Sequence, residues 1–122
     1  MDELVRRKIQ FLEGASMQIH TLKTHPEPFS LVWCGKKQYE YRKDDRDFLV
    51  GDILILHEYD PKLVYPDSEN GPGGVIGHTD RWIVASIESA TFGPDFGVKR
   101  GYAVMSIEVR ARWTKDTKQR DI

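Results

Sequence analysis

The sequence contains a single cysteine, Cys34, among its 122 residues. One cysteine excludes an internal disulfide and cannot build a cysteine-rich zinc site, so we expect a hydrophobic core to hold the fold together. The histidines, at positions 20, 25, 57 and 78, show no spacing typical of metal ligands. The sequence therefore predicts no metal, no cofactor and a reducing, cytoplasmic setting.

The sequence also lacks any apolar run approaching the roughly 20 residues of a membrane span. Arg6, Arg7 and Lys8 interrupt the apolar residues near the N-terminus, so neither a signal peptide nor a membrane partner is predicted. A basic excess is missing as well, because 18 Lys and Arg oppose 19 Asp and Glu, a net charge of −1. Proteins that hold long nucleic acids through phosphates usually show such an excess. A nucleic-acid role would therefore have to rest on a local basic patch or a pocket.

Residues 1–16 are predicted to form a helical extension before the main domain. Val5, Ile9 and Leu12 recur at helical spacing, which predicts an amphipathic helix over residues 2–13. A lone helix of this length is marginal in water, so its apolar stripe needs a covering surface. We expect that surface to be the main domain or a second copy, which would give a homodimer through this helix.

A second, short helix is predicted over residues 26–34, with two prolines in its first turn and a glycine after its end. Phe29, Val32 and Trp33 lie at helical spacing and form one apolar stripe, so we expect them in the core. Cys34 is expected to be a small core residue rather than a nucleophile.

The remainder of the chain is mostly strand-like, with strands predicted at 17–23, 36–43, 53–59, 78–89 and 102–113. One short helix cannot cover both faces of a sheet, so the strands are expected to curl into a small β-barrel with the helix at one end, an α+β fold. The strand at 53–59 is apolar on both faces and should be central. The predicted domain spans residues 17–110, and residues 111–122 form a polar tail.

The stretch from Gly35 to Arg46 crowds charged residues directly before the most apolar strand. In a strand, Glu40 and Arg42 share one face, opposite Tyr39 and Tyr41. A charged cluster on a mostly buried sheet is costly and is more easily explained by a ligand than by stability. The alternative is a solvated outer strand face, and both interpretations stay open.

Three stretches, HTLKTHPEPF, GKKQYEYRKDDRDFLVGDILILHEYDP and FGVKRGYAVMSI, together resemble the ASCH family of the PUA-like superfamily. More narrowly, the chain is similar to an ASCH-related family of unknown function found in bacteria and phages. The resemblance covers residues 17–107. It implies a PUA-like β-barrel with a cleft beside the first core helix, lined by Gly35, Lys37, Glu40 and Arg42. Related domains are associated with RNA binding, and some with RNA cleavage or amide hydrolysis on a modified nucleoside.

The predicted ligand is therefore RNA or a nucleotide, which could be modified. The predicted ligand-binding residues are Lys23 at the rim of the cleft, Lys37, Glu40, Arg42 and, as a gate, Arg46. Lysine and arginine suit phosphate, and a glutamate can accept a hydrogen bond from the exocyclic amine of a base. Tyr39, Tyr41, Trp33 and Trp82 are candidate stacking partners.

Two other functions stay open. The chain could be a small hydrolase acting on RNA or a modified nucleoside, with Lys37 and Glu40 as the candidate catalytic residues. The sequence departs from the amidohydrolase relatives, because Glu40 stands where they have a threonine and residues 90–101 are too short for their helical insertion. A protein-interaction module using the N-terminal helix is the third hypothesis.

The start of the short helix also has two interpretations. Thr24 and Glu27 have the spacing of a capping box, which would give both a structural role. A helix N-terminus beside Lys23 could instead seat an anion.

Overall fold

The computed structural model describes residues 16–62 and 78–114 of the chain. Its strands form one five-stranded sheet in the order β1-β3-β4-β5-β2. Only β1 and β3 run parallel; every other neighbouring pair is antiparallel. The elements are β1 (Ile19–Thr24), α2 (Pro26–Trp33), β2 (Tyr39–Lys43), β3 (Ile53–Tyr59), β4 (His78–Phe92), the 3-10 turn η1 (Asp95–Gly97) and β5 (Tyr102–Thr114).

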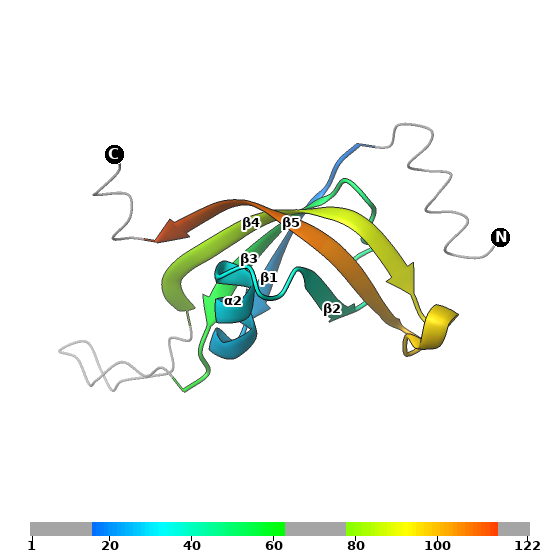
Figure 1. Ribbon diagram of the computed structural model, residues 1–122, viewed down its shortest axis with the longest axis horizontal. Coiled ribbons are helices and arrows are strands. Elements are labelled where there is room, and N and C mark those ends of the chain that lie inside the picture. The colour runs from blue at the N-terminus through cyan, green and yellow to red at the C-terminus, as the bar shows by residue number, and fades with distance from the viewer. Residues whose placement is uncertain (1–15, 63–77, 115–122) are drawn as a thin grey trace, which may run out of the picture.

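The sheet curls into a half-barrel, with α2 lying in the hollow beneath the long arch of β4 and β5 (Figure 1). The edge strands β1 and β2 are linked by side chains. Arg42 on β2 donates to the carbonyl of Lys23 and the hydroxyl of Thr24, and Arg46 donates to the carbonyl of Thr21. The predicted α+β fold, a curled sheet with one short helix, is confirmed at this level.

The core fills the space between α2 and the inner face of the sheet. On β3 burial alternates, with Leu54, Leu56 and Glu58 buried and the residues between them half-buried. This strand lies between β1 and β4, as its apolar sequence predicts. Its second face is only half-covered, because no layer packs there among the described residues. The core residues are Leu22, Phe29, Val32, Phe48, Leu54, Leu56, Ile83, Ala85, Ile87, Phe92, Ala103, Met105 and Ile107.

Helix α2 follows its sequence pattern closely. Phe29 and Val32 are fully buried and Trp33 packs against the core, as predicted. Gly35 adopts a positive φ of 84°, the left-handed conformation expected directly after a helix. The prediction that Cys34 is a core residue is wrong, since its side chain is exposed. Cys34 follows Phe29 by five residues, which places it off the buried i, i+3, i+4 stripe.

Several predictions fall outside the described residues. They include the N-terminal helix at 2–13 and the dimer that it would form. Strand β5 continues to Thr114, so the first four residues of the predicted tail belong to the sheet. Within the two described ranges, no helix has the length and apolar character needed to cross a bilayer.

Candidate functional site

A cleft of about 230 Å³ lies where β1, the start of α2 and β2 meet. It brings together four of the five predicted ligand-binding residues from segments up to 19 residues apart. Its volume is somewhat below the ~300–1,000 Å³ of typical small-molecule pockets, so it suits a single compact group. The lining residues are Lys23, Thr24, His25, Pro28, Lys37, Glu40, Tyr41 and Arg42.

Local geometry explains why β2 supplies the base of the cleft. The positive φ of Gly35 ends α2, and the backbone N–H of Lys37 then donates to the carbonyl of Leu31, which turns the chain back along the helix. In β2 the alternation predicted from sequence holds, because Glu40 is buried while Tyr39 and Tyr41 are about half exposed. The turn thus places the side chains of Lys37 and Glu40 in the lining of one cleft.

Glu40 and Arg42 form the ion pair that their spacing on one strand face predicts. Arg42 Nε donates to Glu40 Oε2 over 2.8 Å, and the two side chains are 24% and 2% exposed. The guanidinium also donates from Nη1 to the Lys23 carbonyl at 2.9 Å and from Nη2 to the Thr24 hydroxyl at 2.8 Å. Three of its five N–H donors are therefore used within the protein. Arg42 thus has a structural role that the sequence analysis did not predict, because its hydrogen bonds link β2 to β1.

The other carboxylate oxygen of Glu40, Oε1, is buried and has no hydrogen-bond partner. Among the described residues it is the only buried side-chain oxygen or nitrogen in that state. An unsatisfied buried acceptor costs about 1–3 kcal/mol, and more when it is charged. Most buried polar atoms in folded proteins are paired, so such an atom calls for a specific cause. Because Glu40 lines the cleft, a ligand that donates an N–H or O–H there would supply the missing partner.

Two lysines add positive charge to the cleft. Lys23 is exposed and its Nζ lies 4.6 Å from the centre of the Tyr59 ring. Lys37 is half-buried, with Nζ 5.1 Å from the centre of the Tyr39 ring. Neither lysine forms an ion pair within residues 16–62 and 78–114. With the arginine of β2, the wall carries three cations against one carboxylate.

The start of α2 differs from the predicted capping box. The N-cap is His25 and no side chain caps the helix, so the capping box is not formed. The hydroxyl of Thr24 accepts from Arg42 instead. Pro26 and Pro28 have no N–H groups, which leaves few donors for an anion at this helix end. The positive charge of the cleft therefore comes from side chains.

Arg46 is not among the residues that line the cleft. Its Nη1 donates to the carbonyl of Thr21 at 2.9 Å, and its Nε lies 3.9 Å from Asp45. This arginine thus supports the edge strand β1, and the predicted gate role gains no support from its position.

A second charged cluster, which the sequence analysis missed, joins β3 to β4. The carboxylate of Glu58 accepts from Arg81 at 2.7 and 2.9 Å and from the Thr79 hydroxyl at 2.7 Å. Burial raises the pKa of Glu58, but the bonds from Arg81 and Thr79 and the charge of Arg81 lower it by more, so it lies below its usual 4.5. The Arg81 guanidinium also stacks 5.0 Å from the rings of Phe29 and Trp33. The alternation of β3, which places Glu58 on the face of Leu56, could have indicated that this carboxylate is buried, but not which residue pairs with it.

A buried histidine–aspartate pair lies at the start of the sheet. His20 Nε2 donates to Asp52 Oδ2 at 2.8 Å, and the ring packs edge-on against Phe48. The same carboxylate accepts the backbone N–H groups of Leu49 and Gln18, both at 3.0 Å. These hydrogen bonds join the Asp52 carboxylate to His20, Gln18 and Leu49, and they hold the turn before β3 against the start of β1. Among the described residues, no group of three His, Cys, Asp or Glu could hold a metal ion.

Comparison with known proteins shows a family match that covers the residues of the cleft. The family model described as a domain of unknown function, DUF3850, matches residues 19–107, which includes every residue that lines the cleft. A protein of Escherichia phage P2, titled "Uncharacterized 12.9 kDa protein in GpA 3'region", is 52% identical over 42 residues. That alignment covers 34% of this chain and 38% of the phage protein.

Proposed function

The chain belongs to the DUF3850 family of domains of unknown function, and we propose that its cleft binds a nucleotide, either free or as part of an RNA. The observation on which this rests most heavily is the buried, unpartnered oxygen of Glu40. We also propose that the curled sheet is a PUA-like barrel of the ASCH kind. The helix in its hollow and the cleft beside that helix support this.

The chemistry of the wall favours a ligand with an anionic part and an N–H donor. Lys23 and Lys37 offer ammonium groups to phosphate, and neither is neutralised by a carboxylate in the described part of the chain. Glu40 offers a buried, charged acceptor, and leaving such an acceptor without a hydrogen bond is energetically costly. The amino groups of cytosine, adenine and guanine are donors of the required type. A nucleotide combines both features in one molecule.

The net charge of the chain limits how the ligand is held. With a net charge of −1, the protein has no general basic field to attract a long polyanion. Recognition through two lysines should therefore involve few phosphates and show a shallow dependence on salt. This fits the small volume of the cleft.

A titration with nucleoside monophosphates and short single-stranded RNA tests the proposal. Lys37→Ala should weaken binding by about 1–3 kcal/mol, because it removes one cationic contact. Lys36→Ala is the matched control, since Lys36 is the exposed neighbour and does not line the cleft. Equal affinities of the two variants and the wild type would refute the cleft as the site.

The same cleft also contains the elements of the alternative function. An amine and a carboxylate, those of Lys37 and Glu40, line one cavity and could exchange protons with a bound substrate. Chromatography of the bound RNA or nucleoside after incubation separates the two proposals. Unchanged ligand supports a binding module, and new product that disappears in Lys37→Ala supports a hydrolase.

A further inference from the structure

Three tyrosines lie on the outer face of β2 and the adjoining end of β5. Tyr39 and Tyr41 are 49% and 48% exposed, and Tyr102 is half-buried. The antiparallel register places Tyr102 opposite Lys43 and Val104 opposite Tyr41, so all of these side chains share one face. The rings of Tyr41 and Tyr102 contact each other edge-on, with 5.3 Å between their centres.

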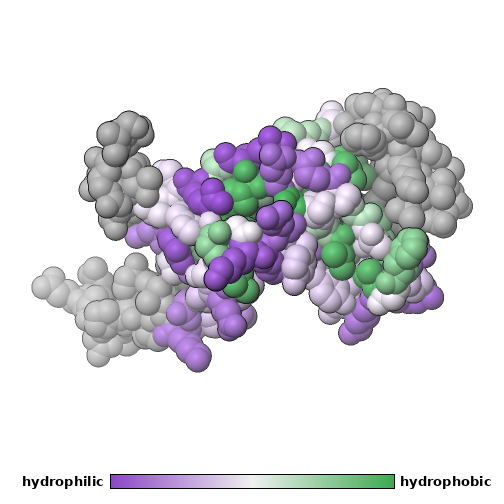
Figure 2. Space-filling view, viewed as in Figure 1, coloured by the Kyte–Doolittle hydropathy of each residue, from purple (hydrophilic) through white to green (hydrophobic). Residues whose placement is uncertain are grey.

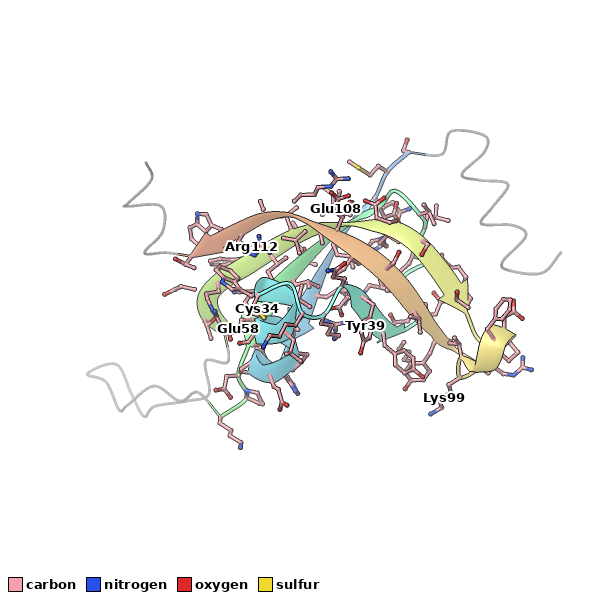
Figure 3. The ribbon with its side chains drawn as sticks, viewed as in Figure 1. Cys34, Tyr39, Glu58, Lys99, Glu108 and Arg112 are labelled. Carbon is pink, nitrogen blue, oxygen red and sulfur yellow. The ribbon has the colours of Figure 1, made fainter. Side chains whose placement is uncertain are left out.

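Each end of this tyrosine row carries a lysine. Lys37 Nζ lies 5.1 Å from the centre of the Tyr39 ring, and Lys99 Nζ lies 5.0 Å from that of Tyr102. Figure 3 shows Tyr39 on β2 and Lys99 beside the adjacent end of β5. Lys43 adds a third cation on the same face. Aromatic rings interleaved with cations are the combination by which proteins hold single-stranded nucleic acids.

The character of this surface favours a polyanion over an apolar protein partner. A protein-docking face would be expected to expose a continuous apolar patch. In Figure 2 the hydrophobic residues of the visible face form separate groups among hydrophilic ones. The tyrosine row itself has a lysine against the ring at each end, and Asp44 and Asp45 follow Lys43 beside the Tyr102 end.

The tyrosine row also adjoins the cleft. Tyr41 borders the cleft although its side chain leaves β2 on the opposite face from Glu40. Lys37 lines the cleft and at the same time lies over the Tyr39 ring. A chain of nucleotides leaving the cleft around the edge strand β2 would therefore meet the tyrosines next.

We propose that the outer face of β2 and the start of β5 stack the bases of a single-stranded nucleic acid whose neighbouring nucleotide occupies the cleft. This inference rests on the proposed function and makes it more specific, because the ligand is then an oligonucleotide rather than a free nucleotide. Stacking on the tyrosines supplies affinity without sequence preference.

The test compares a six-nucleotide single-stranded RNA with a nucleoside monophosphate. The double variant Tyr39→Ala/Tyr102→Ala should bind the RNA about 10-fold or more weakly, because each stacked base contributes substantially. Its affinity for the monophosphate should fall much less than its affinity for the RNA, since neither tyrosine lines the cleft and only Tyr39 contacts a lining residue, Lys37. The matching double phenylalanine variant keeps the rings and should bind the RNA like the wild type. Trp113→Ala, which removes a partly exposed aromatic from the far end of β5, is the control.

The outcomes separate the two proposals. If the wild type binds the RNA no more tightly than the monophosphate, or if the alanine variant keeps its RNA affinity while folded by circular dichroism, the tyrosine surface is refuted and the cleft proposal stands. If neither ligand binds the wild type, the proposed function itself has failed.

Discussion

Replacing Arg42 by methionine should lower the free energy of unfolding by about 3–5 kcal/mol, the usual cost of leaving one partner of a buried ion pair without the other. Glu40 is 2% exposed and its Oε2 accepts from Arg42, while its Oε1 has no partner. The variant therefore leaves a buried carboxylate without its strongest donor. It also removes two bonds to β1, each worth about 1 kcal/mol.

The single variant Glu40→Met should be much less damaging. It removes the unsatisfied oxygen, and the guanidinium of Arg42, which is 24% exposed, can be hydrated in place of its lost bond. In the double variant Glu40→Met/Arg42→Met the uncompensated charge is gone and only the bonds to β1 are lost. We expect the double variant to be more stable than Arg42→Met by at least ~2 kcal/mol.

Urea titration followed by circular dichroism measures these differences. With a slope of about 1–2 kcal/mol per molar, a change of 3 kcal/mol moves the midpoint by roughly 2 M. If the double variant is as unstable as Arg42→Met, the unpaired Glu40 carboxylate does not lower the free energy of unfolding. In that case the pair would be explained by stability, and the argument for a ligand would lose its main support.

Three further predictions concern other parts of the fold. Because the folded-state pKa of Glu58 lies below 4.5, its contribution to stability is present above that pH and is lost as the pH falls through the folded pKa. Melting temperatures of wild type and Glu58→Gln between pH 6 and pH 2 should show the flatter curve for the variant, and parallel curves would contradict this. Asp52→Ala should destabilise the fold by at least ~2–3 kcal/mol, because buried His20 and the backbone N–H groups of Gln18 and Leu49 lose their acceptor. An unchanged urea midpoint would refute the role given to this cluster. Gly93→Ala should cost more than Gly97→Ala in the same assay, since a Cβ at position 93 would collide with the backbone. At position 97 the Cβ of alanine would meet no atom, and only the positive φ of 79° destabilises the variant, by about 1–2 kcal/mol. Equal losses of stability in the two variants would count against the close packing at Gly93.

Local periodicity in the sequence was sufficient to predict the helix and the strands. The stripe of Phe29 and Val32, and the opposite faces of Glu40 and Tyr41, follow from periods of 3.6 and 2 residues. That Glu40 and Arg42 lie on one strand face was likewise predictable from their spacing, whereas the cleft that they share with Lys37 was implied by the family resemblance.

Contacts between distant segments could not be predicted in this way. The bonds from Arg42 and Arg46 to the backbone of β1 depend on the curl of the sheet, which no local pattern encodes. The pairing of Glu58 with Arg81 depends on the register of β3 and β4. The unpartnered state of Glu40 Oε1 results from three-dimensional packing alone.

The most direct test of the cleft is its choice between cytidine and uridine monophosphate. The two ligands differ where cytosine carries an amino group and uracil a carbonyl oxygen, so only cytosine can donate to Glu40 Oε1 from that position. Isothermal titration of the wild type should show at least ~10-fold tighter binding of cytidine monophosphate, the scale of one hydrogen bond to a charged group. Glu40→Gln, whose amide can donate to uracil, should reduce or reverse that preference with little change in salt dependence. Equal binding of both ligands by the wild type, or a preference that Glu40→Gln leaves unchanged, would contradict the account.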